Sequence, residues 1–295
     1  MSGHAFGWRW FGLLAGTGGG VLVLTAVLTA PVAFGDADDP LSGSDTAIIL
    51  GGTLEPTPST AFAQAAENLY LHPLGFDDGA TSSTVCDMIG TDPCAAPLQV
   101  LTTPELIQQS TLTDADDVTL AVENEFNADP GAFTAADPLT IFGYSQSATA
   151  ESIAMTQLAE DGIPSADLHF VFIGDPSLPG GIEANTTVTP DDLYPATIYT
   201  LDGDGVADYQ QDITAGGPLD ALYNLFTTHA EYLGLTATQI ADATTSIDGD
   251  LTNIDISDNI NGFDAFFGAL DNGIGSSGLF ESLWESLQLA LTNMF

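Results

Sequence analysis

The sequence has almost no positive charge. Among its 295 residues are 41 Asp and Glu, four His and a single Lys or Arg, which gives a formal net charge of -40 at pH 7. The one basic residue is Arg9, and the acidic residues all follow it, from Asp36 onward. Because no cations remain to neutralise phosphates, we expect no nucleic-acid partner. The fold must also do without Lys or Arg salt bridges, and self-repulsion predicts sensitivity to ionic strength.

Cysteine is nearly as scarce. The two cysteines, Cys86 and Cys94, enclose a turn-rich stretch that contains Gly90 and Pro93. In an oxidising compartment this spacing predicts one local disulfide. A metal site is disfavoured because no further Cys or His lies beside them to complete a ligand set.

Charge is also missing from a long run near the N-terminus. The stretch from Phe11 to Ala33 is largely apolar and follows Arg9, which is the pattern of an export signal. The run is also long enough to span a bilayer. Residues 1–35 are therefore predicted to be a signal peptide or a single membrane anchor, followed by a linker over residues 36–45. Either way, we expect the protein to be secreted or held at the cell envelope, outside the cytoplasm.

Apolar runs and helical patterns alternate along the next part of the chain. Strands are expected over residues 46–52, 98–101, 139–142, 167–174 and 196–201. Helices are expected over residues 60–71, 113–127, 146–159 and 218–235. This alternation predicts an α/β fold, in which helices cover both faces of a mainly parallel sheet.

The domain is expected to span residues 46–235. Residues 236–295 are interpreted as an acidic C-terminal extension, which is rich in Asp, Thr, Asn, Ser and Gly before an amphipathic stretch. That stretch, residues 279–295, is expected to form a helix. It would either dock on the domain or serve as a lid or a lipid-facing surface near the active site.

The most informative motif is Gly143-Tyr144-Ser145-Gln146-Ser147. It matches G-x-S-x-G, the nucleophile elbow of α/β-hydrolases, except that a serine replaces the last glycine. The motif lies between an expected strand and an expected helix. This context predicts that Ser145 is a nucleophile presented on a tight turn.

A serine nucleophile needs a base, and only four histidines are available. His4 lies in the export segment, His72 precedes the serine, and His169 alternates within a strand as a core residue would. In this architecture the order along the chain is serine, acid, histidine. Elimination therefore favours His229 as the base.

The orienting acid should follow a strand between the serine and the histidine. Asp175 ends one such strand, and Asp202, Asp204 and Asp208 follow the next. The second loop is preferred because the penultimate connection usually carries the acid in this fold. Within it Asp204 comes first, Asp208 second and Asp202 third, and the sequence leaves the choice open.

Two backbone donors are expected for an oxyanion hole. The N–H of Gln146 follows the nucleophile, and the loop Gly51-Gly52-Thr53 ends the first strand. Thr53 is the candidate for the second donor.

The Asp-rich loop also permits a calcium interpretation. Its acidic residues are Asp202, Asp204, Asp208 and Asp212. The loop does not fit the EF-hand pattern, because a start at Asp202 puts Val206 at the fifth position and Ile213 at the twelfth. We therefore expect neither a metal nor another cofactor.

With these residues in place, the chain resembles the PE-PPE domain family of mycobacterial secreted and cell-envelope proteins. The matching segments are residues 49–53 with Pro56 and Pro58, 143–148, 174–176 with 180–181, 204–209 and 229–232. The resemblance implies a cutinase-like α/β-hydrolase fold and a triad of Ser145, Asp204 and His229. The sequence ahead of residue 46 does not match the helical PE or PPE module of that family. Tyr209-Gln210 stands where Phe-Pro is usual, which bears on the choice between Asp204 and Asp208.

The resemblance also implies a serine esterase or lipase that acts on short- to medium-chain acyl esters. An enzymatic alternative is an acyltransferase that moves acyl chains between envelope glycolipids. A third hypothesis, from another class, is an inactive hydrolase fold that serves as a calcium-binding or structural envelope protein.

Overall fold

A computed structural model describes residues 39–77, 79–80, 82–106, 109–257 and 262–275. All of them belong to one compact unit of the chain. The predicted signal peptide or anchor at residues 1–35 and the predicted helix at 279–295 lie outside the described residues. Within the described ranges, none of the helices has the length and apolar character needed to cross a bilayer.

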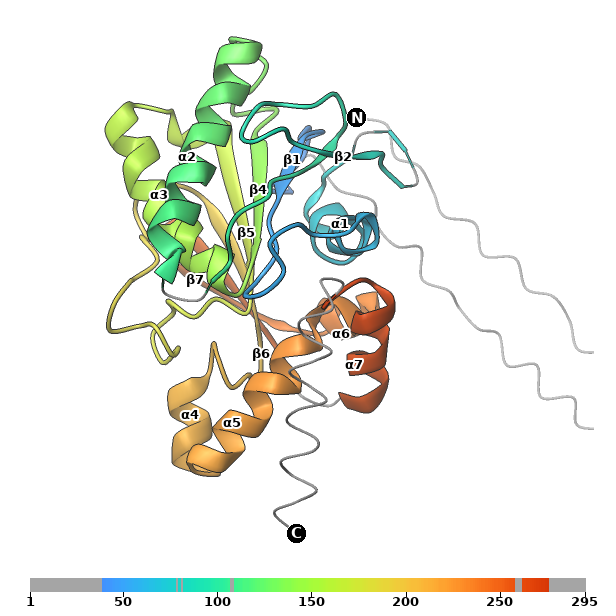
Figure 1. Ribbon diagram of the computed structural model, residues 1–295, viewed down its shortest axis with the longest axis vertical. Coiled ribbons are helices and arrows are strands. Elements are labelled where there is room, and N and C mark those ends of the chain that lie inside the picture. Colours follow the sequence, from blue (N-terminus) through green and yellow to red (C-terminus); the bar gives the residue numbers. More distant parts are fainter. Residues whose placement is uncertain (1–38, 78, 81, 107–108, 258–261, 276–295) are drawn as a thin grey trace, which may run out of the picture. The chain divides into compact units, whose positions relative to one another are not determined.

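The described residues fold around an eight-stranded sheet with the order β2-β3-β1-β4-β5-β6-β8-β7 (Figure 1). The strands are β1 Ala47–Ile49, β2 Val85–Asp87, β3 Leu98–Val100, β4 Leu139–Tyr144, β5 Leu168–Ile173, β6 Ala196–Leu201, β7 Thr244–Asp248 and β8 Leu251–Ile256. Every neighbouring pair is parallel except β7 and β8. The mainly parallel α/β sheet predicted from the sequence is confirmed.

Helices cover both faces of the sheet. The α-helices are α1 Thr60–Ala66, α2 Thr111–Ala128, α3 Gln146–Asp161, α4 Tyr209–Ala215, α5 Pro218–Phe226, α6 Ala237–Ala241 and α7 Gly262–Asp271. Helices α2 and α3 lie on one face, while α1, α6 and α7 lie on the other (Figure 1). Successive strand residues point to opposite faces. In β5, Phe170 and Phe172 therefore join one hydrophobic cluster, and Val171 and Ile173 join the other.

The helix expected over residues 218–235 is shorter in the structure. Helix α5 ends at Phe226, and Thr227 has φ -106° and ψ -76°. Two 3₁₀ turns follow, Thr228–Ala230 and Tyr232–Gly234. The break turns the chain back toward the sheet, so that His229 is buried in a tight turn rather than on a regular helix.

The sheet also extends past the predicted domain boundary at residue 235. Strands β7 and β8 form a hairpin whose turn contains Gly249 with φ 59°. All five residues of β7 are exposed. A strand whose only apolar residue is the exposed Ile247 carries a weak apolar signal, which explains why the sequence pattern assigned this stretch to an extension.

The predicted disulfide is confirmed. Cys86, in β2, is bonded to Cys94 in the loop that leads to β3. The bond closes the loop between two neighbouring strands of the sheet.

Candidate active site

Ser145 occupies the turn between β4 and α3. Its backbone has φ 58° and ψ -118°, a combination that residues other than glycine rarely adopt. The turn is fixed because Ser145 N donates to Ile173 O at 3.0 Å. The neighbouring loop comes so close that a Cβ on Gly52 would lie 2.7 Å from the Tyr144 ring. The sequence motif thus forms a strained strand-to-helix turn, as a nucleophile elbow requires.

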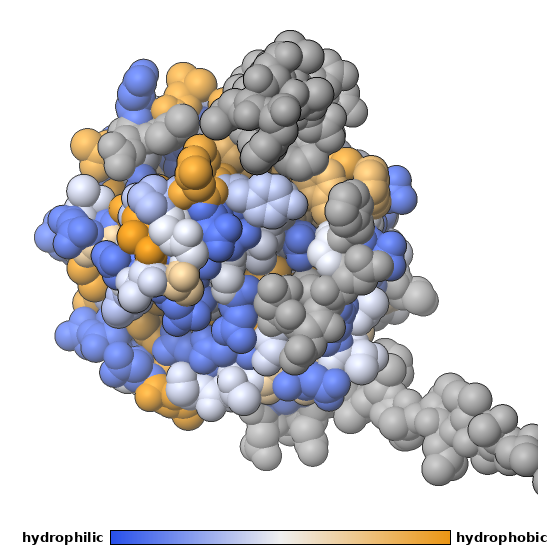
Figure 2. All heavy atoms as spheres, turned by 90° about the horizontal axis from the view of Figure 1, so that it is seen from below, coloured by the Kyte–Doolittle hydropathy of each residue, from blue (hydrophilic) through white to orange (hydrophobic). Residues whose placement is uncertain are grey.

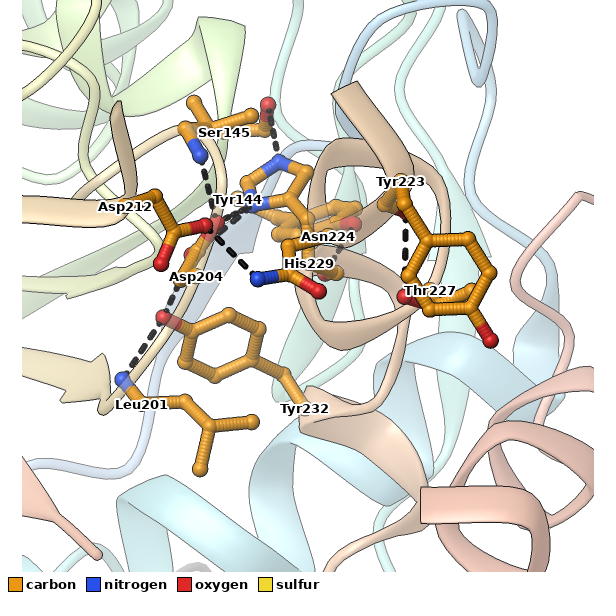
Figure 3. Close-up of polar contacts among 11 residues, drawn as sticks. Tyr144, Ser145, Leu201, Asp204, Asp212, Tyr223, Asn224, Thr227, His229 and Tyr232 are labelled. Carbon is orange, nitrogen blue, oxygen red and sulfur yellow. Dashed lines mark hydrogen bonds and ion pairs between the residues drawn. The ribbon is translucent and has the colours of Figure 1, made fainter. Parts of the chain in front are cut away.

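Three side chains converge at this turn (Figure 3). His229 Nε2 lies 2.7 Å from Ser145 Oγ, and His229 Nδ1 lies 2.8 and 2.9 Å from the two carboxylate oxygens of Asp204. Ser145 and His229 are each 7% exposed, while Asp204 is fully buried. Since Asp204 fixes the Nδ1 side of the ring, Nε2 is the nitrogen that faces the hydroxyl.

Asp204 receives two further hydrogen bonds from neutral donors. Val206 N donates to Oδ1 at 2.8 Å, and the Tyr232 hydroxyl donates to Oδ2 at 2.7 Å. Tyr232 is held in turn because its hydroxyl accepts from Leu201 N at 2.9 Å. These donors hold the Asp204 carboxylate in a fixed orientation toward His229. No sequence motif indicated this role for Tyr232, and its place three residues after the histidine is the only hint.

The position of His229 is fixed from two sides. The Tyr144 hydroxyl donates to His229 O at 2.8 Å, and the two rings stack with their centroids 5.1 Å apart. On the other side lies Gly174, whose φ is +60°. A Cβ at that position would lie 2.8 Å from His229 Cε1. The glycine therefore leaves room for the imidazole, a requirement that the sequence did not reveal.

The other candidate acids lie elsewhere. Asp202 is exposed, and Asp208 occupies the N-cap position of α4. Burial raises the pKa of Asp208 to about 6. Asp175 is fully buried and accepts from Ser177 N at 2.8 Å and from the Thr189 hydroxyl at 2.7 Å. Of the four acids considered from the sequence, Asp204 is the one that contacts His229.

Two of the four aspartates of the possible calcium loop have hydrogen-bond partners of their own. Asp204 faces His229, and Asp212 accepts from Asn224 Nδ2 at 2.8 Å (Figure 3). Across the residues that the structure describes, no group of three or more His, Cys, Asp or Glu could hold a metal ion. The arrangement gives no support to a calcium site.

The two expected oxyanion-hole residues are joined through their side chains. The Thr53 hydroxyl donates to Gln146 Oε1 at 3.0 Å. Gln146 Nε2 donates to Asp114 Oδ2 at 2.8 Å and to Ser110 Oγ at 3.0 Å. Both residues line a cleft beside Ser145. The loop after Thr53 is held as well, since Leu54 N donates to Glu105 O at 3.0 Å.

Buried carboxyl groups lie behind the elbow. The Ser147 hydroxyl contacts Glu105 Oε1 at 2.8 Å, and burial raises the pKa of Glu105 to about 8. Glu151 lies one helical turn after Ser147 and beside Gly143, and burial raises its pKa well above the ordinary value. Burial without a neighbouring Lys or Arg thus favours the protonated form of both acids. Their burial could not be inferred from the sequence.

Two clefts open on either side of the Ser145–His229 pair. One has a volume of about 110 Å³, and its apolar lining includes Leu54, Phe226 and Ile274. The other has a volume of about 230 Å³, and its lining includes Ile182 and Val206. Thr53, Ser145, Leu225 and His229 line both clefts. Ser145 therefore borders two largely apolar clefts.

The mainly parallel sheet, the strained turn after β4 and the chain order serine, aspartate, histidine define an α/β-hydrolase fold. The model of the PE-PPE domain matches residues 95–254, more than half of the chain. The chain therefore belongs to the PE-PPE domain family, and the resemblance found in the sequence is confirmed.

Two relatives come from Mycobacterium tuberculosis. The uncharacterized PPE family protein PPE28 is 29% identical over 65% of this chain and 30% of its own length. Esterase PE16 is 30% identical over 68% of this chain and 39% of its own length. The chain thus spans less than two fifths of the length of either relative. Among solved structures, a cutinase-like protein from Cryptococcus sp. aligns with a TM-score of 0.40 and 15% identity, over 66% of this chain and 98% of its own.

Proposed function

We propose that the chain is a serine esterase that works through an acyl-enzyme. Ser145 is the nucleophile, His229 the base and Asp204 the acid that orients it. The observation that carries the proposal is the continuous series of contacts from Asp204 to His229 to Ser145, with distances of 2.7 to 2.9 Å. The fold and a family relative named as an esterase support the same reaction class.

In the first half-reaction, Ser145 Oγ forms a bond to the acyl carbon while its proton passes to His229 Nε2. Asp204 remains ionised and stabilises the imidazolium through Nδ1. The carbonyl oxygen gains negative charge, and the backbone N–H of Gln146 and the Thr53 loop stabilise it. His229 then gives the proton to the alcohol oxygen as the ester C–O bond breaks.

In the second half-reaction, water replaces the alcohol. His229 Nε2 takes a proton from water as the new C–O bond forms, and Ser145 leaves with that proton. A sugar hydroxyl in place of water would make the enzyme an acyltransferase that acts on glycolipids. Analysis of the products with and without a sugar acceptor distinguishes the two reactions.

The substrate class proposed from the clefts is an uncharged ester with a short- to medium-length acyl chain. Their linings are largely apolar, and their volumes of about 110 and 230 Å³ suit short chains. The net charge of -40 disfavours anionic esters because like charges repel.

We also propose that the enzyme acts outside the cytoplasm, as a secreted or envelope-tethered protein. The Cys86–Cys94 disulfide supports an oxidising compartment. The apolar pattern of residues 11–33 supports export.

The test is labelling with a fluorophosphonate probe. The parent protein should be labelled and Ser145→Ala should not, while Ser165→Ala, which alters an exposed serine, should be labelled like the parent. A folded parent that stays unlabelled would refute the activated serine and leave the structural-protein hypothesis in its place.

The same assay with a soluble ester identifies the acid. Asp204→Asn should lower kcat by about 10⁴-fold, the effect of losing the orienting acid in a serine triad. Asp208→Asn should retain activity within about tenfold, because Asp208 lies at the N-cap of α4. The reverse order would show that Asp208 orients the base.

A further inference from the structure

Helix α5 presents an apolar stripe to solvent. Leu219 is 75% exposed, Leu222 48% and Tyr223 50%. With Phe226 they occupy positions i, i+3, i+4 and i+7, which share one side of a helix. Phe226 lines the smaller cleft beside Ser145. The stripe therefore runs from open solvent to the cleft.

A different side of α5 attaches the helix to the protein. Ala221 is 1% exposed, and Gly205 approaches the backbone of α5 so closely that it has no room for a Cβ. Asn224 is hydrogen-bonded to Asp212 of α4. Because these contacts fix the helix, Leu219 and Leu222 are not needed to hold it.

The exposed stripe continues into the apolar walls of the site. Leu225, the neighbour of Phe226, lines both clefts. Across the larger cleft, Ile182 is 41% exposed and belongs to the same lining. Figure 2 views the end of the molecule at which α4 and α5 lie in Figure 1, and hydrophobic residues are interspersed there with hydrophilic ones. Exposed apolar surface that borders a cleft is typical of a binding surface.

The charge of the chain restricts which partners the apolar stripe of α5 can bind. Asp220 is the single charged residue of α5, and the only Lys or Arg of the whole sequence is Arg9. An anionic bilayer attracts proteins through basic residues and repels one with a net charge of -40. A partner that binds through its own acidic groups is disfavoured for the same reason.

We propose that Leu219, Leu222 and Tyr223 dock the protein onto the surface of an uncharged or zwitterionic lipid aggregate. The docked helix places the opening of the clefts against the ester phase, so that an acyl chain can pass along the stripe to Ser145. The delivery of an acyl chain to Ser145 rests on the proposed esterase function. The binding step itself needs no catalysis.

The test is flotation with lipid vesicles, using a Ser145→Ala chain that begins at Asp36, so that the apolar run at residues 11–33 cannot bind the vesicles and no lipid is consumed. The probes are phosphatidylcholine vesicles and vesicles of equal parts phosphatidylcholine and phosphatidylglycerol. Leu219→Ser/Leu222→Ser is compared with Ile89→Ser/Ile247→Ser, whose original side chains are 83% and 78% exposed on the β2–β3 loop and on β7. Both pairs remove exposed apolar side chains from the surface.

We expect Ser145→Ala to bind phosphatidylcholine vesicles and to bind the anionic vesicles more weakly. The α5 pair should lower the partition coefficient at least about tenfold, and the control pair should change it less than twofold. On a soluble ester, the α5 pair made in the active enzyme should keep the parent kcat/KM, because neither residue lines a cleft.

Equal losses in the two pairs, or no loss in either, would overturn the proposal. Tighter binding to anionic vesicles would overturn the argument from charge. Concentration-dependent dimers that only the α5 pair abolishes, without vesicle binding, would assign the stripe to a second copy of the chain. Fluorophosphonate labelling of the active parent reports on the esterase proposal separately, so the two can fail independently.

Discussion

Gly174→Ala tests how closely the catalytic geometry depends on one missing side chain. Gly174 follows β5 and has a φ of +60°. A Cβ there would lie 2.8 Å from His229 Cε1, 3.0 Å from the Tyr232 ring and 3.1 Å from Asp204 Oδ2. An added methyl group would therefore press on three groups around His229 at once.

Gly174→Ala is expected to lower both the folding free energy and kcat. An L-residue in the left-handed region costs about 1 to 2 kcal/mol of folding free energy. Carbon atoms in ordinary contact are at least 3.4 Å apart, so a Cβ at 2.8 Å must push the imidazole away by about 0.6 Å. Such a shift lengthens the 2.7 Å contact from His229 Nε2 to Ser145 Oγ. Since a 1 Å misplacement costs about 10²-fold in rate, we expect kcat to fall by about 10- to 100-fold.

Gly162→Ala is the matched control. Gly162, at the end of α3, also has a positive φ, +81°, but nothing lies within 4 Å of the position that an added methyl group would take. Both variants should lose a few degrees of Tm, whereas only Gly174→Ala should lose kcat on a soluble ester. Equal kcat values in the two variants would refute the claim that Gly174 makes room for His229.

Three further predictions concern Thr53, the buried acids and the disulfide. Thr53→Val removes the hydrogen bond to Gln146 and should lower kcat by up to about tenfold with little change in KM; an unchanged kcat would contradict this role. Stability should fall as pH rises from about 4.5 to about 8, because folded Glu105 keeps a proton that the unfolded chain releases. The slope is about 1.4 kcal/mol per pH unit for each such group, and Glu151→Gln, which cannot ionise, should make urea-unfolding curves depend less on pH. Reducing the Cys86–Cys94 bond should cost about 2 to 3 kcal/mol, measured by urea unfolding with and without reductant, while loss of all folded signal would contradict a purely local role.

The parts of the site that depend on contiguous residues were predictable from the sequence. The elbow around Ser145 is a five-residue pattern between a strand and a helix, and its strained φ follows from that context. His229 could be predicted as the base by elimination, because the sequence has only four histidines. The structure brings it to Ser145 across 84 residues of chain.

The sequence ranked Asp204 first as the orienting acid but left the choice open, for a geometric reason. Asp202, Asp204 and Asp208 follow the same strand within a few residues, yet the structure leaves Asp202 exposed, Asp204 buried and Asp208 half-buried. Only the return of the chain through α5 decides which carboxylate meets His229. Tyr232 was missed for the same reason, since its hydroxyl reaches Asp204 through the fold rather than through a motif.

The outer strands were missed because of their composition. β7 and β8 carry Thr, Ser, Asn and Asp on much of their surface, and an edge hairpin needs few apolar residues when one neighbour supplies the pairing. The burial of the acids behind the elbow was missed for the opposite reason. Glu105 and Glu151 look like surface residues in the sequence, and nothing in their neighbours' identities reveals that the fold encloses them.

Helices α4 and α5 belong to one continuous excursion of the chain from the sheet, which begins after Asp204 and ends before His229. Both ends are tied to the interior by groups outside the excursion. Asp204 is held by Tyr232 and by its own backbone bond to Leu201, and the carbonyl of His229 is held by Tyr144. The segment between them supplies Val206, Leu225 and Phe226 to the linings of the two clefts. Changes in these side chains therefore alter the shape of the clefts, whereas Tyr232 and Tyr144 hold Asp204 and His229 from outside the segment.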